Sequence, residues 1–272
     1  MADRAEPDRA IDFLPLPMTS RMLLGPGPDM VHPRVMAAMM APLVGHLDPD
    51  FLRVMDGTVH LLRYVFETEN KLTIPISGTG SAGMEAALAA VTEPGDPILI
   101  RVNGYFGLRI AEMARREGAD VATIERPWDE VFTADEISDA LRSRPARVVA
   151  IVHGETSTGA LQRLDDVACA VHDADALLIL DAVSSLAGVP IRVDELGIDV
   201  CYSGTQKCLG CSPGLALSRS VRVLRPGWRD GRPASEPGTW ISRSSANTGA
   251  RSGHITTPPL SRSITLSTWL SV

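Results

Sequence analysis

The sequence predicts an α/β protein whose sheet is mainly parallel and covered by helices on both sides. Short apolar runs of four to six residues recur between helical segments from residue 72 onward. These runs lack the apolar–polar alternation of a half-exposed strand, which indicates strands buried on both faces. Small-residue or polar turns follow several of them, as expected where ligands bind at the carboxyl ends of parallel strands. With 272 residues, of which 44% are hydrophobic, the chain can bury one large core.

The chain before the sheet is expected to hold an arm and two helices. Three prolines oppose helix formation in residues 1–24, the predicted N-terminal arm. Gly25-Pro-Gly-Pro28 then predicts a rigid turn. Proline at the first position favours a short helix from Pro33 to Met40. A longer amphipathic helix is predicted from about Pro49 to Glu67, where apolar residues recur near helical spacing.

Strands and helices alternate after this point. The six predicted strands are Leu72–Ile76, Pro97–Val102, Val121–Ile124, Val148–His153, Leu177–Asp181 and Asp199–Tyr202. The four helices predicted between them are Ser81–Val91, Gly107–Glu117, Ala134–Arg142 and Leu164–Asp173. This alternation is typical of a doubly wound parallel sheet.

Composition limits the partners and the compartment. The formal net charge of −7 gives no reason to expect nucleic-acid binding. No apolar run approaches the roughly 20 residues that a membrane span needs, and the N-terminus shows no signal-peptide pattern. Four cysteines without a secretory signal suggest reduced thiols, so a cytoplasmic protein without membrane contact is expected. Six histidines without ligand spacing and a single Cys208-x-x-Cys211 pair predict no metal site.

The segment Ser77-Gly-Thr-Gly-Ser-Ala-Gly83 follows a predicted strand and opens a predicted helix. Its small residues let backbone amides approach a phosphate, and Thr79 and Ser81 can add hydroxyl hydrogen bonds. The same glycines also fit the dinucleotide fingerprint of an NAD-dependent oxidoreductase. That fingerprint needs an acid at the end of the second strand, where this chain has Val102-Asn103-Gly104. A plain tight turn is a third interpretation.

Asp181 and Lys207 follow two neighbouring predicted strands. Singly, Asp181 also fits a helix cap, and Lys207 fits a solvated surface lysine. Together with the glycine turn, they reach one edge of the sheet in the order that pyridoxal phosphate (PLP) requires. The PLP aldehyde needs a lysine for a Schiff base, and its ring nitrogen needs a carboxylate that keeps it protonated. The residues therefore favour a PLP enzyme.

Two further segments reach the same predicted edge. Gly154-Glu-Thr-Ser-Thr-Gly159 follows the strand that ends at His153, so its hydroxyls lie there. Phe106 follows the strand that ends at Val102, where its ring can stack on a flat cofactor. Taken alone, Phe106 is better explained by core packing.

Residues 23–216 resemble the class V (fold type I) PLP aminotransferases of the alanine–glyoxylate and serine–glyoxylate type. The motifs that carry the resemblance are Leu-Leu-Gly-Pro-Gly-Pro28, Gly-His-Leu-Asp-Pro49, Ser-Gly-Thr-Gly80, Glu-Pro-Gly-Asp96, His-Gly-Glu-Thr-Ser-Thr-Gly159, Leu-Asp-Ala-Val-Ser-Ser185 and Tyr-Ser-Gly-Thr-Gln-Lys207. The resemblance implies a PLP-transferase fold type I large domain over residues 25–216, with a seven-stranded type of sheet. It also implies transfer of an amino group from serine or alanine to glyoxylate, and a homodimer.

The resemblance assigns roles to individual residues. Lys207 is implied as the catalytic lysine that forms the Schiff base and moves the proton, and Asp181 as the partner of the ring nitrogen. Gly27 is implied to line the substrate pocket. The remaining implied cofactor contacts are Thr79, Gly80, Ser81 and Gln206 at the phosphate, Phe106 and Val183 on the ring faces, and Thr156 near the ring hydroxyl.

Residues 217–272 depart from the family pattern. They hold eight arginines, no lysine, eleven serines and only two acids, and the small C-terminal domain with its carboxylate-binding arginine is missing. Residues 238–244 and 254–258 can be back-translated with freely chosen codons and then read with a shift of two bases. The shifted frame gives Tyr-Leu-Asp-Leu-Ser-Leu and Tyr-His-His-Thr, which are two motifs of the family. We therefore expect a truncated or out-of-frame tail without packed structure, and little transaminase activity. A catalytically inactive remnant is the alternative function.

Overall fold

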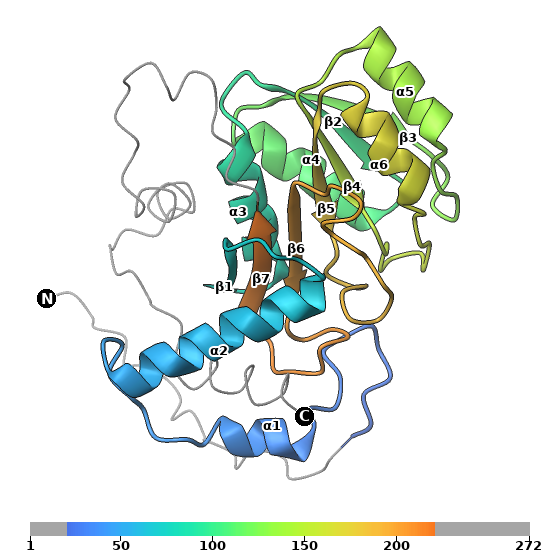
Figure 1. Cartoon of the computed structure of the whole chain (residues 1–272). Helices are drawn as coiled ribbons and strands as arrows, with labels where there is room; N and C mark the ends of the chain where they lie inside the picture. The colour runs from blue at the N-terminus through green and yellow to red at the C-terminus, as the bar shows by residue number, and fades with distance from the viewer. Residues whose placement is uncertain (1–20, 221–272) are drawn as a thin grey trace, which may run out of the picture.

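The computed structural model describes residues 21–220, which form a seven-stranded sheet with helices on both faces (Figure 1). Residues 1–20 and 221–272 lie outside the described residues, and with them most of the predicted arm and tail. The strand order is β1-β7-β6-β5-β4-β2-β3. The strands are β1 (Thr73–Ser77), β2 (Pro97–Val102), β3 (Asp120–Glu125), β4 (Val148–Val152), β5 (Leu177–Asp181), β6 (Val200–Gly204) and β7 (Leu215–Ser220).

Strands β2 to β6 pair in parallel, whereas β7 runs antiparallel to both β1 and β6. The mainly parallel sheet and the six predicted strands are therefore confirmed. The sequence did not predict β7, because only Leu215-Ala-Leu217 is apolar and a Ser-Arg-Ser segment completes the strand. The predicted domain boundary after residue 216 falls inside this strand.

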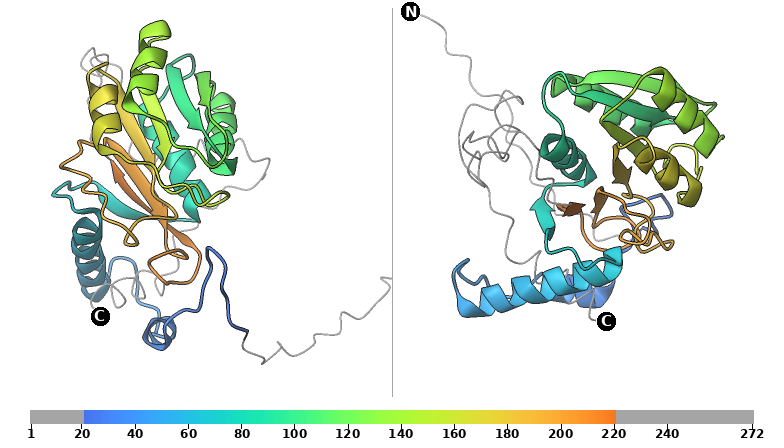
Figure 2. Two further views of the ribbon diagram at one scale, coloured as in Figure 1. Left: turned by 90° about the vertical axis from the view of Figure 1, so that its right-hand side faces the viewer. Right: turned by 45° about the horizontal axis from the view of Figure 1, so that its top comes forward.

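Helices cover the two faces of the sheet unequally (Figure 2). One hydrophobic cluster joins α3 and α4 to the sheet, and the other joins α2, α5 and α6 to the opposite face. Alternate residues of β2 and β4 enter different clusters, as expected for strands buried on both faces. The helices are α1 (Pro33–Ala38), α2 (Pro49–Phe66), α3 (Gly80–Val91), α4 (Tyr105–Arg116), α5 (Ala134–Ser143) and α6 (Asp165–His172).

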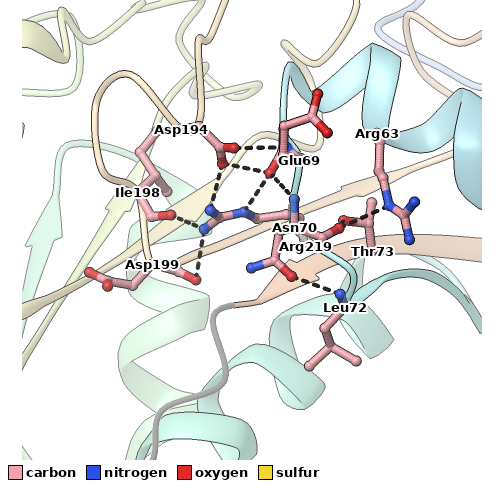
Figure 3. Close-up of polar contacts among 10 residues, drawn as sticks. Arg63, Glu69, Asn70, Leu72, Thr73, Asp194, Ile198, Asp199 and Arg219 are labelled. Atoms are coloured by element: carbon pink, nitrogen blue, oxygen red, sulfur yellow. Dashed lines mark hydrogen bonds and ion pairs between the residues drawn. The ribbon is translucent and has the colours of Figure 1, made fainter.

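Arg219 connects β7 to other segments of the domain through hydrogen bonds and an ion pair (Figure 3). Its guanidinium donates to the Asp194 carboxylate at 2.6 Å, to the Thr68 hydroxyl at 3.2 Å, and to the carbonyls of Ile198 and Asp199. The second carboxylate oxygen of Asp194 accepts from the Glu69 amide at 2.8 Å. This cluster ties the connection after α2 and the segment before β6 to the last described strand.

The chain segment that the structure describes has no helix that is both long enough and apolar enough to span a membrane.

Candidate active site

The candidate site lies at the carboxyl ends of the parallel strands. A cavity of about 470 Å³ is lined there by Lys207, by the turn around Gly27, by the loop that follows β4 and by the serines that follow β5. Asp181 is the last residue of β5, and Lys207 follows β6 after a short turn. The topology thus brings together segments that are far apart in the sequence.

Asp181 is almost fully buried, with 3% of its surface exposed. Its carboxylate accepts from the Val183 amide at 2.9 Å and from the Tyr202 hydroxyl at 2.8 Å. Burial raises the pKa of Asp181 to about 6, although both hydrogen bonds and the Lys207 charge lower it. A carboxylate held in such surroundings is stabilised by a nearby cation, which the protonated ring nitrogen of PLP supplies.

Lys207 lies against the glycine–proline turn that precedes α1. Its Nζ donates to the Pro26 carbonyl at 2.9 Å. A Cβ on Gly27 would lie 2.4 Å from the Gln206 carbonyl oxygen and 2.7 Å from Lys207 Cδ, and the φ of Gly27 is +102°. Glycine is therefore required at this position on two counts, and Gly27 lies beside Lys207 in the lining of the cavity.

The amino end of α3 has the properties of an anion site. Its N-cap, Thr79, makes no side-chain capping hydrogen bond, so no capping side chain occupies the Gly80 and Ser81 amides, while the Ala82 amide donates to the Thr79 carbonyl at 2.8 Å. A Cβ on Gly204 would lie 3.0 Å from Gln206 Oε1 and 3.4 Å from the Gly80 nitrogen, so these two groups are neighbours. Gln206 Oε1 is buried without a hydrogen-bond partner. A half-turn of this amide would present its NH₂ group to a phosphate.

Of the predicted ring-packing and hydroxyl residues, Thr156 lines the cavity, whereas Phe106 and Val183 are not part of its lining. Phe106 and Val183 are both partly buried against the α3–α4 hydrophobic cluster. Phe106 also makes an edge-on contact with Tyr105, with ring centroids 5.4 Å apart. The Thr156 hydroxyl makes a hydrogen bond with the Ser184 hydroxyl. Ser81 lies in the first turn of α3.

Three site residues were not predicted from the sequence. Tyr202 binds Asp181, and a buried tyrosine at the end of an apolar strand signals a hydroxyl that needs a partner. His153 Nδ1 lies 2.9 Å from Ser185 Oγ, and burial lowers the pKa of His153 to about 4. Glu155 is 1% exposed and has four hydrogen-bond donors around it.

The dinucleotide alternative does not agree with the sheet. In that fold the strand that carries the glycine turn lies at the centre of the sheet beside the next strand of its βαβ unit. Among the described strands, β1 is an edge strand that pairs only with β7, and β2 lies four positions away from β7 in the sheet. Within residues 21–220, no group of three or more His, Cys, Asp or Glu side chains is placed to hold a metal ion.

Comparisons with known proteins agree with the geometry. Residues 34–217 match the family model "Aminotransferase class-V". The alanine–glyoxylate aminotransferase of Rattus norvegicus is 42% identical over 203 residues, which are 75% of this chain and 49% of that protein. The (S)-ureidoglycine–glyoxylate transaminase of Bacillus subtilis (strain 168) is 43% identical over 196 residues, which are 72% and 47% of the two chains.

Solved structures extend the likeness to the fold. A crystal structure of alanine–glyoxylate aminotransferase from Nostoc sp. superposes with a TM-score of 0.86 at 43% identity, covering 99% of this chain and 72% of that one. The chain spans about half the length of the curated relatives that it matches. Class-V aminotransferases depend on PLP, and the buried carboxylate, the lysine and the uncapped helix end fit that cofactor. This chain belongs to the class-V aminotransferase family.

Proposed function

We propose that residues 25–216 are the cofactor-binding domain of a transaminase that moves the amino group of alanine or serine to glyoxylate and gives glycine. The observation that carries this proposal is that Asp181 ends β5 and Lys207 follows β6, the strand paired with β5, so that both lie at the carboxyl edge of the sheet. When bound, PLP supplies an electron sink for the bond that breaks at the α-carbon of the amino acid.

Different residues would hold different parts of PLP. Lys207 would hold the aldehyde, and Asp181 would hold the ring nitrogen. The other proposed contacts are Thr79, Gly80, Ser81 and Gln206 for the phosphate, Phe106 and Val183 for the ring faces, and Thr156 for the ring hydroxyl.

The chain's own groups supply the acid–base chemistry in this proposal. The Asp181 carboxylate, fixed by Val183 and Tyr202, keeps a proton on the ring nitrogen. The Lys207 amine moves the proton at the substrate α-carbon, for which it must leave the Pro26 carbonyl that now accepts its hydrogen bond.

Small substrates suit the cavity. Glycines and short side chains, including Gly27, Gly154 and Ser185, form much of its lining. The two relatives compared above are named for glyoxylate as acceptor, but they differ in the amino donor. We propose alanine or serine as the donor here, and a cytoplasmic homodimer as the working assembly.

Turnover by the 272-residue chain itself should be low. Within the described residues, no arginine lines the cavity, so the bidentate clamp that a substrate carboxylate needs is missing. The family match ends at residue 217, directly before the Ser-Arg-Ser segment of β7. We propose that the reading frame shifts near this point. Sequencing the coding DNA tests this, and the lack of a single-base change that opens a family-like frame would refute it.

The cofactor proposal is tested by adding PLP to the purified chain. We expect a visible absorption band in the wild-type protein and none in Lys207→Ala. Asp181→Asn should keep a band but bind PLP less tightly. A wild-type protein without the band, or a Lys207→Ala protein that keeps it, would overturn the proposal.

A further inference from the structure

Glu155 is a buried carboxylate to which the proposed chemistry gives no role. Its Oε2 accepts from the amides of Phe106 at 3.1 Å and Gly107 at 3.4 Å. Its Oε1 accepts from the Ser157 amide at 3.1 Å and from the Ser157 hydroxyl at 2.6 Å. Both oxygens are thus occupied by donors from the chain itself.

These contacts complete the amino end of α4, the helix that carries Phe106. The N-cap of α4 is Gly104, which has no side chain to cap the helix. Ser157 Oγ accepts from the Tyr105 amide at 3.0 Å, so Glu155 and Ser157 together bind the first three amides of α4. The helix dipole favours a negative charge at this point.

Glycine at residue 104 permits this approach. A Cβ at that position would lie 2.3 Å from Glu155 Cγ and 2.5 Å from its Cδ. No real side chain is tolerated at such distances, so any larger residue would push the carboxylate away from the helix. The loop after β4 and the start of α4 are therefore built to fit each other.

The same loop is tied on its other side to the segment that follows β5. The hydroxyls of Thr156 and Ser184 bind each other, and His153 Nδ1 lies 2.9 Å from Ser185 Oγ. Ser184 directly follows Val183. The loop therefore connects the helix that carries Phe106 to the segment that carries Val183.

We propose that Glu155 is a positioning residue, which holds the Phe106 ring at a fixed separation from Val183 so that a flat cofactor ring fits between them. The inference rests on the proposed PLP site. Glu155 lines the cavity, but both of its carboxylate oxygens are occupied by donors of the chain, so it acts through the α4 amides.

A carboxylate is needed because four donors converge on it. Glutamine offers one acceptor oxygen, and its NH₂ group would face either the α4 amides or the Ser157 donors. Facing α4, the NH₂ group leaves the Phe106 and Gly107 amides without their acceptor; facing Ser157, it leaves the Ser157 amide without one, although the Ser157 hydroxyl can turn to accept. Glu155→Gln is consequently the conservative variant that isolates this function.

The chain offers a matched control in Glu136. This residue also caps a helix with its carboxylate, which accepts from the Thr133 amide at 2.8 Å and the Thr133 hydroxyl at 3.0 Å and pairs with Arg126. It lies on a helix that does not border the cavity. Glu136→Gln therefore tests the loss of a helix cap without a change at the site.

The experiment measures the dissociation constant of PLP and the amide hydrogen exchange of residues 105–107 in the full chain. We expect Glu155→Gln to weaken PLP binding about tenfold, which corresponds to about 1.4 kcal/mol, and to accelerate exchange at these amides. Ser157→Ala, which keeps the charge and removes one hydroxyl, should give smaller changes in the same direction. Glu136→Gln should leave both quantities unchanged.

A double-mutant cycle shows whether the effect passes through Phe106. If it does, Glu155→Gln adds little to the loss of PLP affinity caused by Phe106→Ala. Unchanged PLP affinity in Glu155→Gln, or full additivity with Phe106→Ala, would overturn the inference alone. Failure of the wild-type protein to bind PLP would overturn the proposed function together with this inference.

Discussion

The two ends of the parallel strands differ in how their buried polar groups are satisfied. At the amino end of β6, the Arg219 guanidinium has acceptors in two side chains and two carbonyls. At the carboxyl end, Gln206 Oε1 is buried without a partner, the first turn of α3 lacks a side-chain cap, and Asp181 has a raised pKa. Polar groups that the fold satisfies hold the fold together, whereas groups that it leaves unsatisfied mark the place of a ligand.

The largest effect on the free energy of unfolding is expected at the amino end of β6, where the Arg219 guanidinium has hydrogen-bond partners. Arg219→Ala removes the donor to the carbonyls of Ile198 and Asp199 and the cation beside Asp194, which keeps only the Thr68 hydroxyl and the Glu69 amide as donors. Arg219 is buried but the Asp194 side chain is 37% exposed, so we expect a loss of about 3 kcal/mol, the lower end of the range for breaking a buried ion pair. The free energy of unfolding from urea titration of the full chain measures this. A loss below about 1 kcal/mol would mean that solvent replaces these hydrogen bonds, and the contrast between the two ends would disappear.

The pH dependence of stability sharpens the contrast at the carboxyl end. Burial lowers the pKa of His153 from 6.5 to about 4. The contribution of His153 to the free energy of unfolding is therefore fully present above pH 6.5 and is lost as the pH falls through about 4. Burial raises the pKa of Asp181 from 3.8 to about 6. The contribution of Asp181 to the free energy of unfolding is therefore fully present below pH 3.8 and is lost as the pH rises through about 6. The two contributions have opposite slopes, and at about 1.4 kcal/mol per pKa unit each amounts to about 3 kcal/mol.

Asp181→Asn removes one of these opposing contributions from the PLP-free protein. The stability difference between variant and wild type should then grow in favour of the variant as the pH rises from 4 to 6.5. His153→Asn should show the reverse trend. Urea midpoints across this range provide the measurement, and a difference that does not change with pH would contradict the assignment.

The sequence predicted the elements more completely than it predicted the contacts. Lys207 and Asp181 were predicted because each follows a strand, and such positions converge in a parallel sheet, whereas Gly27 was implied only by the family resemblance. Glu155 and Tyr202 were missed because their roles depend on donors and acceptors more than 20 residues away. Strand β7 was missed for the same physical reason, because Arg219 becomes a buried residue only through partners on other segments.

Arg101 on β2 is an exception to the contrast. Its side chain is buried over the Phe132 ring, with the guanidinium carbon 4.3 Å from the ring centroid, and all three of its nitrogens lack hydrogen-bond partners. Burial lowers its pKa to about 9, so it remains charged at neutral pH. Because an apolar residue avoids this desolvation, Arg101→Met should raise the free energy of unfolding by about 1–3 kcal/mol. A loss of stability in urea titration would show that the cation–ring contact outweighs burial of the charge.

The smallest effect tests this contrast with two glutamines, buried Gln162 and partly buried Gln206, whose side chains differ in their hydrogen-bond partners. Gln162 accepts from the Phe132 amide at 3.0 Å and donates to the carbonyls of Phe132 at 2.9 Å and Arg163 at 2.8 Å, whereas Gln206 Oε1 has no partner. Methionine has a similar length and no group that needs a hydrogen bond, so Gln206→Met should stabilise the PLP-free chain by about 1 kcal/mol. Gln162→Met should instead destabilise it by about 2 kcal/mol.

Affinity for PLP should change in the opposite sense from stability. Gln206→Met should weaken PLP binding because it removes a polar group beside the amino end of α3, while Gln162→Met should leave PLP binding unchanged. Thermal unfolding without PLP and a PLP titration of the same samples separate the two quantities. If Gln206→Met instead lowered stability and left PLP affinity intact, Gln206 would stabilise the fold, as Arg219 does. The proposal that the amino end of α3 binds the phosphate would then be wrong.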